Sequence, residues 1–241
     1  MADQTVRQET FWRFSVLQRA LHLIVILGFV GIGLTGFSMA FSSVAPARTF
    51  VWFLGGADSV RYLHRFFAVV MYLCVVTHVF WLFYYKFILG GDLFGPNSIC
   101  FRKQDLLYFR DHIGYLLALR NAPPAFDRFT YWEKLDYWAI FIGMQSMSLT
   151  GLFLWFPEFF SRFLPGYFIN IAQVLHFDEG VLAVLYIFCI HLTVGHWRPE
   201  VYPGDWTIFT GKTTKETMMK THPGEWASLN PSPRGSAIGE K

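Results

Sequence analysis

The chain has 241 residues, of which 54% are hydrophobic, 20% are aromatic and only 15% are charged, and its mean hydropathy is +0.35. A water-soluble domain of this composition would have too few polar side chains to cover its surface, so an ordinary soluble globular protein is excluded. The formal net charge is only +3, which gives no indication of a nucleic-acid partner.

Four stretches of the chain contain no Asp, Glu, Lys or Arg and are long enough to cross the hydrocarbon core of a bilayer. In chain order they cover residues 20–47, 66–85, 137–157 and 181–197. We therefore predict an all-α integral membrane protein, a four-helix bundle in one domain over residues 1–200. The predicted helices cover about residues 16–41, 62–86, 132–157 and 174–197.

Two further segments lie outside the predicted helices. The loop between the second and third helices is long for a bundle, and glycine and proline pairs flank an amphipathic stretch, residues 104–119. We expect this stretch to lie as a short helix at the membrane interface. Residues 201–241 are polar and are expected to form a tail on the cytoplasmic side.

The distribution of Lys and Arg sets the orientation, because basic residues are enriched in cytoplasmic loops. Sixteen of the 20 lie before the first helix, between the second and third, or after the fourth. The others, Arg48, Arg61, Arg65 and Arg162, fall on the opposite side. Both termini and the long loop are thus predicted to be cytoplasmic, in a multi-pass protein embedded in the lipid of the bacterial cytoplasmic (inner) membrane.

Five histidines lie at the ends of the apolar segments. His64 and His78 flank one segment, His176 and His191 flank another, and His22 begins the first. The fourteen residues from His64 to His78 advance ~21 Å along a helix and return to within about 40° of the starting direction. The fifteen residues from His176 to His191 end roughly 60° away from the starting direction. Each pair therefore places one imidazole near each membrane face. His22, His78 and His191 would lie near the inner face, and His64 and His176 near the outer face.

These histidines have the pattern of metal ligands. An ionisable side chain in lipid must face the bundle interior, so intramembrane histidines are often functional. A zinc or copper site needs ligands that converge on one point, whereas most of the membrane separates His64 from His78. Bis-histidine haem, with one ligand from each of two facing helices, fits the spacing better. Cys74, Cys100 and Cys189 are isolated, and none stands in a C-x-x-C-H motif for covalent haem attachment.

Four motifs extend this pattern: Phe14-Ser-Val-Leu-Gln-Arg-Ala-Leu-His22, Thr35-Gly-Phe37, Arg61-Tyr-Leu-His64, and His176 followed by His191. Together they resemble the cytochrome b subunits of membrane formate dehydrogenases and nickel–iron hydrogenases, over about residues 12–200. The resemblance implies two haem b groups. His22 and His191 would hold the inner haem, and His64 and His176 the outer haem.

The inner face has one histidine more than two haems need. Spacing alone would pair His78 with His191, as in the cytochrome b of bc complexes, and would leave His22 over. In the hydrogenase subunits the position of His78 looks like an arginine near the inner haem, so His78 could instead contact a haem propionate or a quinone. A third haem between His78 and His196 is a further alternative.

The resemblance also implies a site for menaquinone or ubiquinone on the cytoplasmic side, near the start of the third helix. The Asn-x-x-Gln-Lys pattern of the formate dehydrogenase subunit corresponds here to Thr130-Tyr-Trp-Glu133-Lys134. The lysine is kept, while Thr and Glu replace Asn and Gln. Glu133 or Asp136 could exchange protons with the quinone, although acidic residues are equally typical of a helix N-terminus.

These features predict the membrane cytochrome b subunit of a respiratory redox complex, which transfers electrons between an outer-face partner and the quinone pool. The partner would be an iron–sulfur subunit or a multihaem c-type cytochrome. The chain has no substrate site of its own, so any oxidoreductase activity would belong to the complex. A histidine-dependent proton or ion transporter and a cofactor-free membrane anchor are the alternatives.

Overall fold

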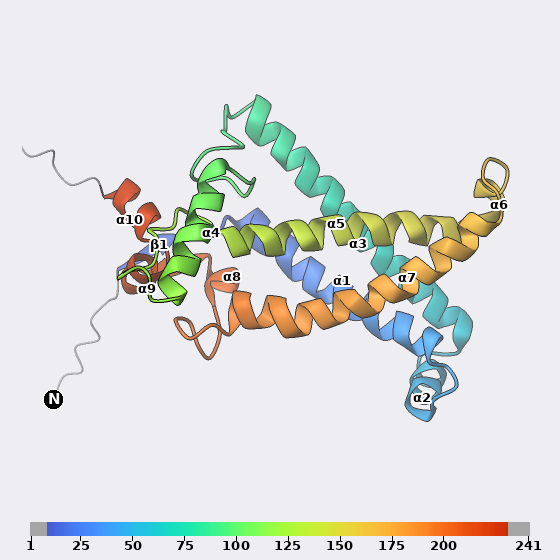
Figure 1. Ribbon diagram of the computed structural model, residues 1–241. Helices are drawn as coiled ribbons and strands as arrows, with labels where there is room; N and C mark the ends of the chain where they lie inside the picture. Colours follow the sequence, from blue (N-terminus) through green and yellow to red (C-terminus); the bar gives the residue numbers. More distant parts are fainter. Residues whose placement is uncertain (1–8, 231–241) are drawn as a thin grey trace, which may run out of the picture.

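The computed structural model describes residues 9–230 and contains four long apolar helical spans (Figure 1). They are α1 (Val16–Ala40), α3 (Ala57–Phe87), α5 (Tyr131–Trp155) and α7 (Tyr167–Tyr186), the last of which continues into a π-helix, η1 (Ile187–His196). The spans contain 25 to 31 residues, and a helix needs about 20 to cross a bilayer. The prediction of an all-α membrane bundle is confirmed.

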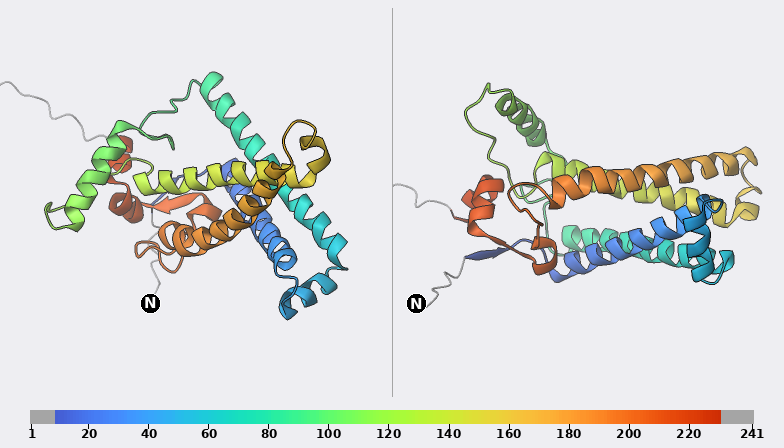
Figure 2. Two further views of the ribbon diagram at one scale, coloured as in Figure 1. Left: turned by 45° about the vertical axis from the view of Figure 1, so that its right-hand side comes forward. Right: turned by 90° about the horizontal axis from the view of Figure 1, so that it is seen from below.

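The long helices form two helical hairpins that lie in two layers. α1 packs mainly against α3, and α5 packs mainly against α7. Viewed from below, the α5–α7 hairpin lies over the α1–α3 hairpin (Figure 2, right). Contacts between the layers are sparser and join chiefly α1 to α7 and α3 to α5. Side chains from different hairpins therefore meet in the middle of the bundle.

The two ends of the bundle differ. At one end, here named the capped end, lie α4 (Lys103–Leu116), α8 (Thr207–Thr210), α9 (Lys215–Thr221), α10 (Pro223–Leu229) and a two-stranded antiparallel sheet (Figure 1). The sheet pairs β1 (Thr10–Trp12) with β2 (Lys212–Thr214). At the other end, the distal end, lie two short helices, α2 (Ala45–Phe53) and α6 (Pro157–Phe160) (Figure 1).

The segment predicted as a polar tail, residues 201–241, is partly folded. Its described part contains α8, β2, α9 and α10, whereas residues 231–241 lie outside the described residues. β2 completes the sheet with β1, and Met218 and His222 of this segment are only 1% exposed. The C-terminal segment therefore packs over the capped end of the bundle.

Local sequence signals explain where several elements begin. α1 starts at a capping box, in which the Ser15 hydroxyl accepts from the Gln18 main-chain N–H and the Gln18 side chain accepts from the Ser15 N–H. Thr130 starts α5 in the same way. Between α2 and α3, Gly55 and Gly56 have φ angles of 91° and 102°, which residues with side chains rarely adopt. Here the chain turns back into the bundle.

Two spans begin earlier than the sequence pattern indicated. α3 starts at Ala57 instead of residue 62, and α7 at Tyr167 instead of 174. Each start directly follows a glycine, Gly56 or Gly166. Helix formation thus continues past the apolar segment as far as the nearest glycine-containing turn, because hydropathy limits the membrane-embedded part and not the helix itself.

Buried side chains are distributed unevenly over the spans. Among the described residues, the buried apolar side chains of the spans belong mostly to α3: Val60, Met71, Cys74 and Val75. In the fourth span, from Tyr167 to His196, Ala172 is buried and the other side chains are partly or fully exposed.

Candidate functional site

Two pairs of histidines face each other across the layers of the bundle. The ring centroids of His64 on α3 and His176 on α7 are 6.3 Å apart, and those of His22 on α1 and His191 on η1 are also 6.3 Å apart. With metal–nitrogen bonds of about 2 Å and ring nitrogens roughly 1.1 Å from the ring centre, two imidazoles on opposite sides of one metal ion have centroids about 6.3 Å apart. Both pairs therefore have the separation of a bis-imidazole metal site.

In the distal pair, a threonine on the other helix of the same hairpin orients each ring. Nδ1 of His64 lies 3.0 Å from Oγ1 of Thr35, and Nδ1 of His176 lies 3.0 Å from Oγ1 of Thr150. Each hydroxyl donates to a main-chain carbonyl one turn back along its own helix, at 2.6 and 2.9 Å, so it accepts from the imidazole. The ring proton is thus held on Nδ1, which leaves Nε2 of each ring free to bind a metal ion.

A glycine follows each of these threonines. A Cβ atom at Gly36 would lie 3.3 Å from Cε1 of His64, and a Cβ atom at Gly151 would lie 3.2 Å from Cε1 of His176. A larger side chain at either glycine would therefore displace the imidazole. The two hairpins share one local arrangement, in which a Leu-Thr-Gly tripeptide on the first helix faces a histidine on the second.

The pair nearer the capped end has a third imidazole beside it. The ring centroid of His196 lies 5.9 Å from that of His22 and 5.1 Å from that of His191. A π-helix bonds residue i to residue i+5, so His191 and His196 lie one turn apart on the same face of η1. Ligand atoms of all three rings lie within 4.8 Å of one another. This cluster has the composition and the separation of a compact metal site.

The ring of His191 contacts a carboxylate, where the distal rings contact hydroxyls. Nδ1 of His191 lies 2.7 Å from Oδ2 of Asp136 on α5, and both side chains are 18% exposed. The Nδ1–H group donates to this oxygen, so Nε2 is free on the opposite side of the ring. Within the described part of the chain, neither His22 nor His196 has a side-chain hydrogen bond of this kind.

His78 lies apart from both pairs. Its Nε2 atom lies 2.6 Å from the hydroxyl of Tyr137 on α5, and its ring stacks on Trp81 with a centroid separation of 6.3 Å and an interplanar angle of 20°. The ring contacts of His78 among the described residues include neither His191 nor His196, the two partners considered for it from the sequence.

The three residues predicted to bind quinone lie at the start of α5, at the capped end. Thr130 and Glu133 form the capping box of α5, and Glu133 also accepts a hydrogen bond from Arg198 at 3.2 Å. Lys134 is 0% exposed, and its Nζ lies 2.9 Å from both carboxylate oxygens of Asp105. All three side chains therefore have structural partners, and their contact with a quinone stays a prediction.

A network of charged groups joins the C-terminal segment to the capped end. Glu225 pairs with Arg13 and, at 2.9 Å, with Arg128. Next to this network, Nε2 of His222 lies 3.5 Å from Oε2 of Glu133. Burial, followed by the nearby guanidinium groups with Arg13 first, lowers the pKa of His222 to about 2. His222 is therefore a neutral, buried part of this network.

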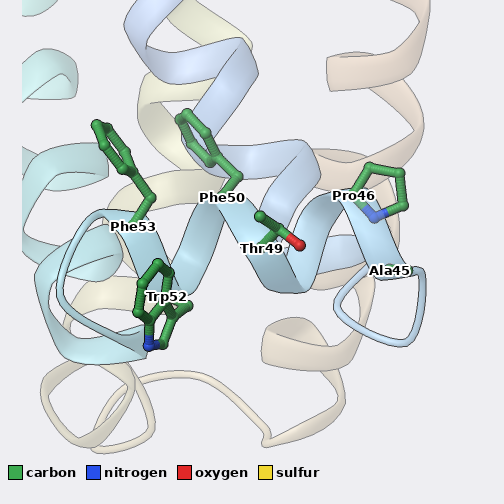
Figure 3. Close-up of a pocket in the computed structure, with 6 residues that line it drawn as sticks. All are labelled: Ala45, Pro46, Thr49, Phe50, Trp52 and Phe53. Atoms are coloured by element: carbon green, nitrogen blue, oxygen red, sulfur yellow. The ribbon is translucent and has the colours of Figure 1, made fainter.

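The distal end has an apolar hollow that does not involve the histidines. It is lined by Ala45, Pro46, Thr49, Phe50, Trp52 and Phe53, all from α2 (Figure 3). The side chains of Trp52 and Phe53 are among the most exposed aromatic groups of the chain, at 78% and 76%. Exposed aromatic rings on a short helix at the end of a bundle are typical of the membrane–water interface.

Comparison with known families agrees with the paired histidines. The family model described as prokaryotic cytochrome b561 matches residues 13–204, a range that contains the four spans and both facing pairs. The chain belongs to the prokaryotic cytochrome b561 family. It is therefore a membrane b-type cytochrome, and membership of this family implies haem b.

Similar proteins within curated sequences include cytochrome subunits of formate dehydrogenases. The cytochrome b556(Fdn) subunit of the nitrate-inducible enzyme of Escherichia coli K12 is 21% identical over 212 residues, which cover 88% of each chain. The cytochrome b556(fdo) subunit of the same organism is 24% identical over 221 residues, or 90% of this chain and 92% of the relative. The cytochrome b556 subunit of Haemophilus influenzae is 23% identical over 208 residues, or 85% and 77%. The predicted resemblance is confirmed.

Some residues of the site were not identified from the sequence. Thr150 and Gly151 were not predicted, although the second Leu-Thr-Gly tripeptide, matching the one at Thr35, is a signal that could have found them. Asp136 was considered only as a proton carrier and not as a partner of His191. The approach of His196 to His191 depends on the π-helix, for which the sequence shows no comparable signal.

Proposed function

We propose that this cytochrome is the membrane subunit of a respiratory redox complex and transfers electrons between a partner at the distal face and the quinone pool at the capped face. His64 and His176 would hold a distal haem b, and His22 and His191 a second haem b nearer the capped end. The observation that carries this proposal is the 6.3 Å separation of the ring centroids in both pairs. This is the separation expected for two axial imidazoles on one iron.

The surroundings of the distal pair suit a bound haem. Thr35 and Thr150 keep Nδ1 of both rings occupied, so that both Nε2 atoms are available for the iron. Gly36 and Gly151 add no side chain beside the imidazoles, so these two rings could keep their position when a haem binds. Small residues at helix interfaces also permit close packing, but here each glycine directly faces a histidine ring.

At the inner site the geometry favours His191 over His196 as the second ligand. Of the three ring pairs in the cluster, His22–His191 has the 6.3 Å separation, whereas the pairs with His196 are shorter, at 5.9 and 5.1 Å. Asp136 also orients His191 through Nδ1. His78 uses Nε2 to contact Tyr137, which supports a role beside the haems and argues against a third haem.

Haem b with two histidine ligands supplies a one-electron carrier without an open coordination position, and this favours electron transfer over oxygen chemistry. The residues of the chain position the four imidazoles, and hydrogen bonds fix the ring proton on Nδ1 of His64, His176 and His191. Since each site needs one histidine from each hairpin, haem binding would also hold together two layers that make few direct contacts.

The orientation and partners follow from the distribution of charge and from the relatives. Basic residues predict that the capped end and both termini are cytoplasmic and that the distal end faces outward. The formate dehydrogenase relatives support a dehydrogenase complex, with an iron–sulfur subunit or a multihaem c-type cytochrome at the distal face. Menaquinone or ubiquinone would bind at the capped end near Thr130, Glu133 and Lys134, where Glu133 or Asp136 would exchange protons with it.

Quantitative haem extraction from the purified protein and its histidine variants tests the proposal. We expect two haems b per chain in the wild type and in His78→Ala. One haem should remain in each of four single variants, His22→Ala, His64→Ala, His176→Ala and His191→Ala. If His78→Ala loses a haem while His22→Ala keeps two, the inner ligand pair is His78 with His191. A wild-type protein without a Soret band would contradict the haem proposal itself and favour a proton transporter or a plain anchor.

A further inference from the structure

The two candidate haem sites differ in the groups that hold their histidines. At the distal site, both Nδ1–H groups donate to neutral hydroxyls, those of Thr35 and Thr150, over 3.0 Å. At the inner site, His191 donates to the carboxylate of Asp136 over 2.7 Å. The shorter distance is typical of a hydrogen bond whose acceptor carries a full negative charge.

One helix supplies the partners of both histidines of the fourth span. α5 places Thr150 beside His176 near the distal end and Asp136 beside His191 near the capped end. The sites therefore differ in the chemistry of the acceptor and not in which element supplies it.

A carboxylate acceptor changes the properties of a metal-bound imidazole. It pulls the Nδ1 proton toward itself, which makes the imidazole a stronger electron donor to the metal through Nε2. A stronger axial donor, and a negative charge close by, stabilise ferric over ferrous haem and lower its reduction potential. The Asp136 side chain is only 18% exposed, so water and salt screen its charge weakly.

We propose that Asp136 is a positioning residue that lowers the reduction potential of the inner haem through its hydrogen bond to His191. Both distal ligands instead donate to neutral threonine hydroxyls. This inference rests on the ligand pairs proposed above. The inner haem would therefore have a lower reduction potential than a haem with the same two ligands but without the carboxylate.

The test is a potentiometric titration of the two haems in the purified protein, followed in the visible α-band. Asp136→Asn keeps an oxygen that can accept from Nδ1 of His191 but removes the charge. We expect the potential of one haem to rise and the other to stay unchanged. Thr150→Val is the matched control on the same helix and should produce a smaller rise in the other haem. The proposal is overturned if Asp136→Asn leaves both potentials unchanged or moves the same haem as Thr150→Val.

A second measurement needs no change at Asp136, in case that variant loses haem. His64→Ala should retain only the inner haem, and His22→Ala only the distal one. The near-infrared magnetic circular dichroism band of ferric haem reports the donor strength of its axial ligands, and we expect it at higher energy in His64→Ala. Equal band energies would overturn the role of Asp136, whereas a wild-type protein with fewer than two haems would instead overturn the proposed function.

Discussion

The ammonium group of Lys134 at the start of α5 is completely buried and lies 2.9 Å from both carboxylate oxygens of Asp105 on α4. Its third contact is the main-chain oxygen of Cys100, at 3.2 Å. The pair joins the long loop between the second and third spans to the end of a membrane helix. Since neither charge reaches water, each depends on the other for its stability.

We expect Lys134→Met to lower the free energy of unfolding by about 3–5 kcal/mol, because it leaves the Asp105 carboxylate buried without a counter-charge. Thermal unfolding in detergent, followed by circular dichroism, measures this loss. The double variant Asp105→Leu/Lys134→Met should recover much of it, since an apolar pair of similar volume leaves no unpaired charge.

Arg110→Met is the matched control for that prediction. Arg110 also lies on α4 and pairs with Asp111, but its side chain is 65% exposed, and exposed ion pairs contribute about 0–1 kcal/mol. Equal stability losses in Lys134→Met and Arg110→Met would show that the buried pair is not structural. If Lys134→Met unfolds like the wild type but raises the KM for quinol, the lysine contacts quinone directly.

A second prediction concerns the glycines beside the distal histidines. We expect Gly36→Val and Gly151→Val each to reduce the haem content from two toward one, because even a Cβ atom would lie 3.3 or 3.2 Å from a ligand ring. Gly33→Val, on the same helix as Gly36, should keep both haems, since its Cβ atom would meet only Val184, at 3.9 Å. Haem extraction measures all three variants. Loss of haem in Gly33→Val alone would contradict the assignment of the distal site.

The sequence predicts those features of the fold that depend on local composition, and it does not predict those that depend on how the helices pack. The four spans were predictable because crossing a bilayer requires long uncharged segments. The choice between His22 and His78 as the partner of His191 was not, because it depends on helix rotation and on which helices are neighbours. Fifteen residues of regular α-helix would separate His176 and His191 by roughly 60°, and the π-helix from Ile187 alters that relation.

The folding of the C-terminal segment over the capped end was also not predictable from the sequence. The ion pair between Arg13 and Glu225 joins residues 212 positions apart, and the short helices α8 to α10 lack the long apolar periodicity that identifies a span. Polar composition after residue 200 indicated only a segment outside the membrane. Its packing against the capped end arises from tertiary contacts, such as those that bury Met218 and His222.

A third prediction tests the role of His196. We expect His196→Ala to keep two haems per chain, because the separation of its ring from that of His22 is 5.9 Å, below the value of the other facing pairs. Its visible spectrum should also stay that of bis-histidine haem. Elemental analysis of the purified protein tests the alternative, in which the cluster binds zinc or copper. Zinc or copper in the wild type that disappears in His196→Ala would show that the cluster of His22, His191 and His196 binds a metal ion directly.

The last prediction is a loss of stability of the capped end in acid. Burial lowers the pKa of His222 from its ordinary value of 6.5 to about 2, so between these two values the unfolded segment binds more protons than the folded one. The stabilisation is complete above pH 6.5 and decreases as the pH falls below it. Each pH unit in that window costs up to about 1.4 kcal/mol.

Limited proteolysis of the C-terminal segment between pH 5 and pH 8 measures this effect, because cleavage follows local opening of the capped end. Cleavage of the wild type should accelerate as the pH falls below about 6.5, after correction for the protease's own pH dependence. Neither ring nitrogen of His222 has a hydrogen-bond partner among the described residues, so His222→Phe removes the titrating group without breaking a hydrogen bond. We expect a weaker pH dependence in this variant. An unchanged acid response in His222→Phe would show that His222 is not its source.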